Sequence, residues 1–504
     1  MKYLLALDIG TTSVKAGLFD ETCNLIASST GEYLLLTPAA ERAELDPGTY
    51  WQASVNAIKA VVSRAGVDAA NIVGLTISSQ GETLIVLDEN NTPLMNAIVW
   101  VDNRATRQAA ELNEKLNTEV YQVTGIPEIM PTWPACKILW LRQECPEIFR
   151  RAKKFLLVQD YLVWRFSGDF VTDGSISCTT MYYDINRHAW WQCCLEAIGI
   201  TTDQLPQIKR AGDIAATISP TASDLSGLST CTKVILGGMD QAVGAIGAGN
   251  VVEGIISETT GSALAIQACA TNPSIDPHKV TPVYLHSVPG MYLLVPVCPT
   301  AGMTLKWFKD AFFSDLVQES VTSGTNIYKV LDEMAAAVPA GADGLSMLPH
   351  LMGAFSPLPN AAARGSFTGF TLAHGRGHFV RAILEAVAFL LRQNIESIES
   401  AGLMVSEIRT SGGGSHSNLW NQIKADVTHR PILRLETEDS ALLGDAILAG
   451  VACGIFDSIE AACKSSVMIK ERILPGPDAG FYTGVYRRYC DLDKTLGDFF
   501  QRNY

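Results

Sequence analysis

The chain has 504 residues, of which 47% are hydrophobic and 18% charged, and its formal net charge is −14. This composition excludes an intrinsically disordered chain, and the length suggests two large domains or three ordinary ones. Because surfaces that bind nucleic acid or anionic membranes are basic, the acidic balance disfavours both partners. The cysteines form no C-x-x-C motif and no apolar run reaches membrane length, so we expect buried thiols and a cytoplasmic location.

The first segment of the chain predicts a β-hairpin whose turn could bind an anion. An apolar run over residues 3–9 is followed by the polar turn Gly10-Thr11-Thr12-Ser13 and by a second apolar run. The carboxylate of Asp8 can hold Mg²⁺ through water, and the turn offers hydroxyls and amides to phosphate oxygens. An ordinary polar hairpin turn is the alternative for the same residues.

Strands and helices alternate through the rest of the first half, which indicates an α/β domain. The helical periodicity covers residues 49–65 and 105–116. The strand-like runs cover residues 73–80, 83–88 and 94–100.

The segment Trp100-Val101-Asp102-Asn103-Arg104 is suited to a polyol. An indole face covers the C–H side of a sugar, while Asp102 accepts and Arg104 donates hydrogen bonds to hydroxyls. A surface Asp–Arg pair beside a buried tryptophan is the alternative. Gln80 ends an expected strand and Glu82 follows it, and a carboxylate there would suit a hydroxyl-rich ligand and repel an acid sugar.

The second half repeats the pattern of the first segment. Residues 254–266 again form an apolar run, an acid, Thr-Thr, Gly and Ser, and another apolar run. This echo makes an internal duplication plausible, with two related domains that meet near residues 240–250. A long helix is expected over residues 380–398. A strand, a glycine turn and a helix follow over residues 408–427, and such a turn presents free amides to a ligand.

The common nucleotide and hydrolase motifs are absent. Neither G-x-x-x-x-G-K-[ST] nor G-x-G-x-x-G between a strand and a helix occurs, and H-E-x-x-H and G-x-S-x-G are also missing. These absences disfavour P-loop and Rossmann binding, zinc peptidases and α/β-hydrolases. His374 and His378 share a helical spacing, but we expect structural roles for both.

Two hydroxyl-rich loops, one from each half, resemble the actin, sugar-kinase and Hsp70 superfamily of ATPases. Further motifs resemble the FGGY family of carbohydrate kinases over nearly the whole chain. The segment Lys137 to Glu144 matches the K-x-x-W-[apolar] portion of the first family signature, whose usual start differs at Thr132. The second signature is approached by residues 365–370 and 378–385. Three more motifs follow the family order, namely Gly237-Gly238-Met239-Asp240-Gln241, Ala301 to Trp307, and Gly412 to Gln422.

This resemblance implies an α/β fold of two duplicated ribonuclease H-like domains, of the actin/hexokinase/Hsp70-type ATPase, with the active-site cleft between them. The expected division is a sugar-binding domain over residues 1–245 and a nucleotide-binding domain over residues 246–504. The resemblance further implies an ATP-dependent kinase that uses Mg²⁺ and phosphorylates a small ketose, first D-xylulose to xylulose 5-phosphate. The expected partner is a small sugar or polyol, and we also consider a homodimer.

The resemblance also implies the roles of individual residues. Asp240 is expected to be the general base that takes the proton from the attacking sugar hydroxyl, and the alternative is that it only ligates Mg²⁺. The expected metal ligands are Asp8 and Asp240. The expected sugar contacts are Gln80, Glu82, Trp100, Asp102, Arg104, Asp240 and Gln241. The expected nucleotide contacts are Thr11, Thr12, Ser13, Lys15, Thr260, Gly261, Gly302, Lys306, Gly413, Gly414 and Ser417.

Three alternatives concern the function. Gln80-Gly81-Glu82-Thr83 is closer to the Gln-Arg-Glu-Thr of glycerol kinases than to the Met-His usual in kinases of xylulose, which favours a glycerol- or erythritol-type polyol kinase. A non-catalytic sugar-binding regulator on the same scaffold would lack Asp8 or Asp240, or add a basic DNA-binding helix, and neither is the case. An actin- or chaperone-like ATPase would leave residues 100–104 unexplained.

Overall fold

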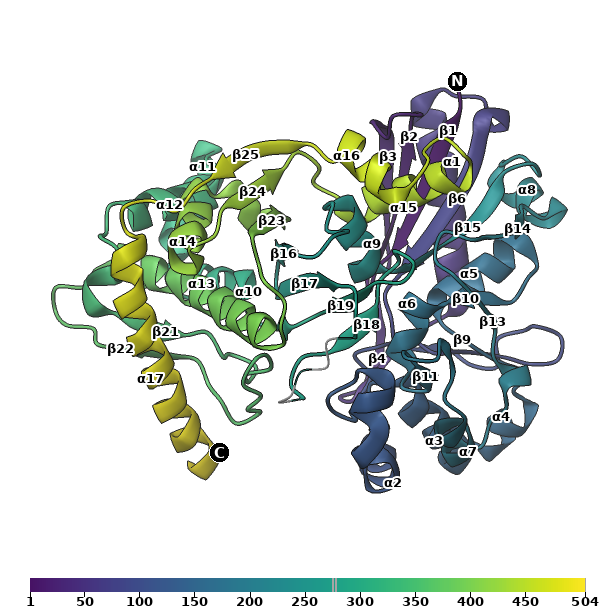
Figure 1. Ribbon diagram of the computed structural model, residues 1–504, viewed down its shortest axis with the longest axis horizontal. Helices are drawn as coiled ribbons and strands as arrows, with labels where there is room; N and C mark the ends of the chain where they lie inside the picture. The colour runs from purple at the N-terminus through teal and green to yellow at the C-terminus, as the bar shows by residue number, and fades with distance from the viewer. Residues whose placement is uncertain (274–275, 277–278, 504) are drawn as a thin grey trace.

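The structure is a computed structural model that describes residues 1–273, 276 and 279–503. Two mixed β-sheets, one from each half of the chain, form its two sides, and helices lie on and between them (Figure 1). The N-terminus lies on the first sheet, whereas the C-terminal helix packs on the far side of the second half (Figure 1). The arrangement is therefore a two-part α/β fold, as predicted.

The first sheet has the strand order β14-β15-β6-β1-β2-β3. Strand β1 pairs antiparallel with β2 and parallel with β6, while β3 and β14 lie antiparallel at the two edges. The central strands are buried on both faces, which explains their continuous apolar runs. The strands are β1 (Tyr3–Ile9), β2 (Ser13–Phe19), β3 (Leu25–Glu32), β6 (Ile72–Ser79), β14 (Ile214–Thr217) and β15 (Lys233–Met239).

The second sheet repeats this arrangement in the order β18-β19-β17-β16-β23-β24-β25, with β20 also paired to β17. Strand β16 pairs antiparallel with β17 and parallel with β23, and β25 lies antiparallel at one edge. The strands are β16 (Ile255–Thr260), β17 (Leu264–Ala270), β18 (Val283–Leu285), β19 (Tyr292–Leu294), β20 (Val297–Cys298), β23 (Glu407–Ser411), β24 (Ile432–Leu435) and β25 (Ile469–Ile473). The shared pairing pattern of β1 and β16 confirms the predicted duplication.

The helices include the predicted ones, with longer bounds. The helix expected over residues 49–65 is α1 (Pro47–Ala65), which begins at the side-chain cap Asp46 and ends at the left-handed Gly66. The helix expected over 380–398 is the buried α13 (Arg376–Ser400). The other helices of the two halves are α2 (Thr106–Thr124), α3 (Pro134–Glu144), α4 (Pro146–Arg151), α5 (Val158–Ser167), α6 (Gly174–Ser177), α7 (Gln192–Ile198), α8 (Pro220–Ser226), α10 (Gly302–Phe312), α11 (Ser314–Ser323), α12 (Ile327–Ala336), α14 (Asn418–Thr428) and α17 (Ala479–Asn503).

Three helices lie between the two sheets, namely α9 (Asp240–Gly247), α15 (Ser440–Ala452) and α16 (Ile459–Ser466) (Figure 1). Helix α15 packs on α9 and on strands β1 and β6 of the first sheet. The α9–α15 contact requires glycine, because a Cβ at Gly247 would lie 1.8 Å from the Ser440 carbonyl oxygen and one at Gly444 2.0 Å from the Val243 carbonyl oxygen. The division into residues 1–245 and 246–504 stays a prediction, since α15 belongs to the second part by sequence but packs on the first sheet.

Short strands complete the fold, and one of them differs from the prediction. The strand expected over residues 94–100 is only β8 (Ala97–Ile98), because the chain then turns so that the Val99 carbonyl accepts from the backbone N–H of Asp102. The other short strands are β4 (Leu36–Ala39), β5 (Arg42–Leu45), β7 (Ile85–Leu87), β9 (Lys154–Leu156), β10 (Val171–Asp173), β11 (Tyr183–Asp184), β12 (Ala189–Trp190), β13 (Gln207–Lys209), β21 (Ser346–Leu348) and β22 (Ser366–Thr368).

None of the helices in the described part of the chain has the length and hydropathy needed to cross a membrane. The cytoplasmic location and the homodimer stay predictions.

Candidate active site

The sheet topology brings three predicted site segments to one edge. Strands β1, β6 and β15 run parallel to one another, and Asp8, Gln80 and Asp240 lie at or directly after their carboxyl ends. In open α/β sheets, ligands bind outside the carboxyl ends of the strands. Two carboxyl groups, from Asp8 and Asp240, and the amide group of Gln80 therefore lie at the same edge of the first sheet.

Hydrogen bonds to its backbone atoms fix the hairpin turn between β1 and β2. The N–H of Gly10 donates to the Ser13 carbonyl at 2.9 Å, and the N–H of Tyr33 donates to the Thr12 carbonyl at 2.9 Å. The phenol of Tyr33 donates to the Gly10 carbonyl. These bonds fix Thr11, Thr12 and Ser13 as a tight, partly exposed turn at the end of β1, so the predicted hairpin is confirmed.

The Asp8 carboxyl group is buried and only partly satisfied. Its Oδ1 atom has no hydrogen-bond partner among the described residues. Burial raises the pKa of Asp8 to about 8, and the negative charges of Asp439 and Asp240 add to this effect while Lys15 opposes it. A buried oxygen of this kind fits a cation that arrives with a ligand, because an unsatisfied buried acceptor is costly.

Lys15 spans the two halves of the chain. Its Nζ atom lies 2.7 Å from Oδ2 of Asp439, whose other carboxylate oxygen accepts from the N–H of Leu442 and caps helix α15. Lys15 thus faces the same region as Asp8, as the phosphate-binding prediction requires, but it is paired with a carboxylate. Asp439 was not predicted, because no local motif connects residues 424 positions apart.

Asp240 begins helix α9 directly after β15. Its Oδ1 atom accepts from the backbone N–H of Gln241 at 2.7 Å, and burial raises the pKa of Asp240 to about 6. The preceding Gly238 has φ +120°, and a Cβ there would lie 2.2 Å from the Ser175 hydroxyl oxygen, so the turn before Asp240 requires glycine. The strand-to-helix turn aims a carboxyl group with a pKa near neutrality into the space beside Asp8.

Gln80 and Glu82 form one wall beside Asp240. The Gln80 amide donates to the Tyr50 hydroxyl at 3.2 Å, while its buried Oε1 has no partner among the described residues. Burial raises the pKa of Glu82 to about 8, the charge of Asp240 adds to this rise, and that of Lys137 opposes it. The expectation that a carboxylate at Glu82 would repel an acid sugar stays a prediction.

Trp100 connects the segment after β8 with the hairpin turn between β1 and β2. Its indole Nε1–H donates to the Thr11 hydroxyl at 2.8 Å, and its backbone N–H donates to the Thr83 hydroxyl at 3.1 Å. The side chain is 40% exposed, so one part of the ring remains open to a ligand. A sugar that packed on this indole would touch a residue bonded to the predicted phosphate site.

Asp102 and Arg104 are directed into the protein. The Asp102 carboxylate accepts from the Ala43 N–H at 2.7 Å and from Arg104 Nε and Nη2 at 2.8 and 2.7 Å. Arg104 also lies 2.6 Å from Glu44, and the side chains of Asp102 and Arg104 are 0% and 3% exposed. Their contact with a sugar stays a prediction. In this structure they brace the segment that carries Trp100.

Lys137 joins this wall, although its motif indicated only family membership. Its Nζ atom donates to the carbonyl oxygens of Glu82 at 2.8 Å and Val99 at 3.0 Å, on the two segments that carry predicted sugar contacts. Burial lowers the pKa of Lys137 to about 7, against the opposing effect of the Glu82 and Asp102 charges. Only the spacing of the motif could have singled out this residue from sequence.

On the second sheet, the loop after β16 lies against the glycine turn after β23. A Cβ at Gly414 would lie 2.7 Å from the Thr260 Cβ, whereas Cβ atoms at Gly261 and Gly413 would meet open space. Gly302, the first residue of α10, donates its N–H to the Gly261 carbonyl at 3.0 Å. The structure thus brings together Thr260, Gly261, Gly302, Gly413 and Gly414 from the predicted nucleotide site.

Three other predicted residues have protein partners. The Ser417 hydroxyl caps helix α14 by accepting from the Trp420 N–H at 3.0 Å. Lys306 points to solvent and pairs with Asp310 at 2.7 Å, on the next turn of α10. The Gln241 side chain accepts from the amide of Gln267. Their contacts with ligands stay predictions.

Among residues 1–273, 276 and 279–503, no group of three or more His, Cys, Asp or Glu side chains could hold a metal ion. The two carboxyl groups of Asp8 and Asp240 nevertheless suit Mg²⁺, which proteins usually bind through one or two carboxylates together with substrate phosphates. The unsatisfied Asp8 Oδ1 atom is the observation that supports this fit.

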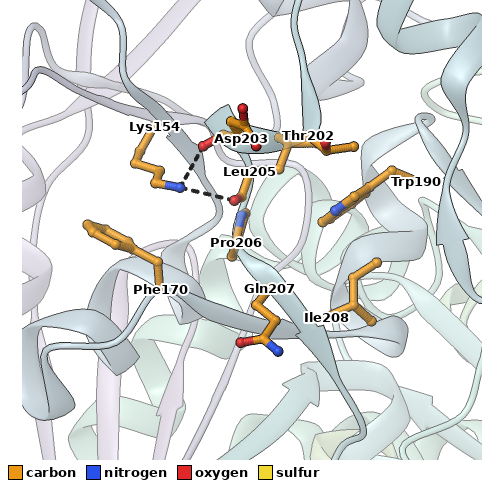
Figure 2. Close-up of a pocket in the computed structure, with 9 residues that line it drawn as sticks. All are labelled: Lys154, Phe170, Trp190, Thr202, Asp203, Leu205, Pro206, Gln207 and Ile208. Carbon is orange, nitrogen blue, oxygen red and sulfur yellow. Dashed lines mark hydrogen bonds between the residues drawn. The ribbon is translucent and has the colours of Figure 1, made fainter.

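Two cavities lie away from this site. One of about 490 Å³ is lined by Lys154, whose Nζ atom donates to the Asp203 and Leu205 carbonyls, and by aromatic residues including Phe170 and Trp190 (Figure 2). The other, of about 760 Å³, lies between α13, α17 and the loop after β21. Neither cavity is lined by a predicted site residue.

Comparison with known proteins gives concordant matches over the whole chain. The models of the FGGY family of carbohydrate kinases match residues 3–247 with the N-terminal domain and residues 258–453 with the C-terminal domain. A xylulose kinase of Bacillus subtilis (strain 168) is 30% identical over 99% of both chains. A gluconokinase of the same organism is 31% identical over 91% of this chain and 89% of its own. The crystal structure of a xylulose kinase from Lactobacillus acidophilus superposes with a TM-score of 0.92 at 26% identity, covering 100% of both chains.

Proposed function

We propose that this chain, which belongs to the FGGY family of carbohydrate kinases, transfers the γ-phosphoryl group of ATP to D-xylulose and yields xylulose 5-phosphate. The observation that carries a kinase function is the convergence of Asp8, Gln80 and Asp240 at one edge of the first sheet. The xylulose assignment is supported by the similarity to xylulose kinases over nearly the full length of both chains.

The acceptor hydroxyl is proposed to lie against Asp240, whose carboxylate takes its proton as the bond to phosphorus forms. Phosphoryl transfer has a loose transition state, so positioning and charge neutralisation contribute most of the catalysis. Asp8 and Asp240 would hold Mg²⁺, which when bound offsets the negative charge of the phosphates. The turn of Thr11, Thr12 and Ser13, with Lys15, is proposed to bind the phosphates from one side and residues 260–261 and 413–414 from the other.

The charged residues around the predicted sugar contacts support a neutral acceptor. The two cations described there, Arg104 and Lys137, both donate to protein oxygens, so neither is directed to the carboxylate of an acid sugar. A glycerol- or erythritol-type polyol is the second candidate, because Gln80-Gly81-Glu82-Thr83 offers an amide and a carboxyl group to a short polyol. The non-catalytic regulator is disfavoured, since Asp8 and Asp240 are both present and aimed at one site.

A coupled assay of ADP release tests the acceptor. Ketopentoses, glycerol, erythritol and gluconate are compared at equal concentration with saturating ATP and Mg²⁺. We expect D-xylulose to give the highest kcat/KM. A higher value with glycerol or erythritol would favour the polyol alternative, and a higher value with gluconate would contradict the assignment of a neutral acceptor.

The pH dependence of the reaction is expected to report Asp240. Because its pKa is raised to about 6, the carboxylate needed as a base is present above that pH and is lost below it. We expect kcat/KM to fall about tenfold per pH unit below about 6, since the pH profile of kcat/KM reports the free enzyme. A profile that stays flat down to pH 5 would contradict this role.

Two substitutions of Trp100 distinguish the contribution of its aromatic ring from that of its hydrogen bond to Thr11. Trp100→Phe keeps an aromatic face but removes the N–H that donates to Thr11, a bond of about 0.5–1.5 kcal/mol. We expect the KM for sugar to rise by up to about tenfold in Trp100→Phe and more in Trp100→Ala. Sugar-independent ADP release should rise in Trp100→Ala, because water then competes as the acceptor. Equal KM values in all three proteins would exclude a sugar contact at Trp100.

A further inference from the structure

A fully buried ionic network lies under the loop that follows β16. Lys424 on α14 places its Nζ atom 2.6 Å from Oε1 of Glu258 and 2.7 Å from the hydroxyl oxygen of Thr260. Thr260 donates its hydroxyl to Oε2 of Glu258 at 2.8 Å, and Thr410 on β23 donates to Oε1 of the same carboxylate. The side chains of Glu258 and Lys424 are both 0% exposed. The network thus ties three elements of the second half together.

The polar groups of this network satisfy one another. The carboxylate accepts from Lys424, Thr260 and Thr410, and the ammonium group also lies 5.2 Å from the centre of the Trp420 ring. Replacing a buried ion pair by apolar residues of similar size is often neutral or even stabilising. The stability of the fold therefore does not require charged residues at positions 258 and 424. Both charges lie beside the loop after β16, which faces the glycine turn after β23.

The network engages the hydroxyl of Thr260, which donates to Glu258 and accepts from Lys424. The Cβ of Thr260 packs against Gly414, and Thr259 packs against Gly412 in the same way. The neighbouring glycines of both segments, Gly261 and Gly413, border open space. Thr260 is therefore the contact that sets the separation between the loop and the glycine turn.

We infer that Glu258 and Lys424 are positioning residues for the nucleotide, which fix the loop at residues 260–262 against the glycine turn at residues 412–414. The inference rests on the proposed function, because it requires a nucleoside triphosphate or diphosphate to lie between these two segments. It replaces the expected phosphate contact of the Thr260 hydroxyl with a structural role for that group. Removal of the network should weaken nucleotide binding and leave sugar binding unchanged.

The test compares ADP binding by calorimetry, without sugar, in wild type and in variants. In the double variant Glu258→Leu with Lys424→Leu we expect the Kd for ADP to rise by about tenfold or more. Thr260→Val, which replaces the hydroxyl with a methyl group of similar size, should raise the Kd several-fold, whereas Thr260→Ser, which keeps the hydroxyl, should have a Kd near the wild-type value. The KM for sugar should stay within about twofold of wild type in all of them.

A second buried ion pair gives the matched control. Arg381 and Glu385 on α13 lie 2.8 Å apart with side chains 7% and 2% exposed. Arg381→Leu with Glu385→Leu should leave the Kd for ADP of the folded protein unchanged, whatever its effect on the melting temperature. If Glu258 and Lys424 had a purely structural role, their double variant would also bind ADP with the wild-type Kd, and this result would overturn the inference.

Two further outcomes are distinguishable. If the Glu258 and Lys424 double variant fails to fold, Thr260→Val carries the test, and an ADP affinity equal to wild type would overturn the inference. If wild type binds no ADP, the proposed function fails, and the inference fails with it.

Discussion

Asp240→Asn is expected to lower kcat by about 10²- to 10⁴-fold, the contribution typical of a positioned general base. Asparagine keeps the size of the side chain and the oxygen that accepts from the Gln241 N–H, but it cannot take a proton. The KM for sugar should change by less than about threefold, because the loss concerns the transition state. Steady-state ADP release at saturating ATP and sugar measures both parameters.

Two comparisons make this result specific. Asp213→Asn changes a carboxylate of the same half that pairs with Arg210 at the surface, and it should leave kcat unchanged. The residual activity of Asp240→Asn should also lose the decline below about pH 6. If Asp240→Asn keeps near wild-type kcat while sugar still binds, Asp240 is not the base.

Arg104→Met is expected to destabilise the protein by about 3–5 kcal/mol, since it leaves the buried Asp102 carboxylate without its cation. Asp102 is 0% exposed, and two of its hydrogen bonds come from the guanidinium group of Arg104. Equilibrium unfolding in urea, followed by tryptophan fluorescence, gives the free energy of unfolding.

Arg107→Met is the matched control for this change. Arg107 lies close to Arg104 in the sequence, but it is 70% exposed and pairs with Glu144 at the surface. We therefore expect its replacement to lower the free energy of unfolding by less than about 1 kcal/mol. If Arg104→Met were as stable as wild type but bound sugar at least tenfold more weakly, Arg104 would contact the sugar and would not act as a brace.

The duplicated fold could be predicted because its signal is local. Each half carries an apolar strand, an acid, a hydroxyl-rich turn and a second strand, and these segments became β1–β2 and β16–β17. The packing of helix α15 on the first sheet could not be predicted from such patterns. This helix lies far along the chain, yet its Asp445 accepts from the Ser78 hydroxyl at 2.7 Å on the first sheet. Packing between distant segments has no local sequence pattern.

The candidate site was predictable to a similar extent. Asp8 lies near the carboxyl end of β1 and Asp240 directly follows β15, and both strands pair in parallel with β6, so the position of each residue in its motif was informative. Asp102 and Arg104 show where residue type alone leaves two interpretations open, because the same side chains that suit a polyol also satisfy one another in the interior. Asp439, and the role of Lys137 beside the site, became visible only when their hydrogen-bond partners were known.

The most direct test of the proposed function is whether ADP release by wild type depends on an acceptor. The reaction is run with Mg²⁺ and ATP, with and without D-xylulose, and the products are followed by ³¹P NMR. We expect ADP and a sugar phosphate ester to form in equal amounts with D-xylulose, and only trace ADP without it. ADP release at the same rate without an acceptor, or no turnover with any sugar or polyol, would contradict the proposed function.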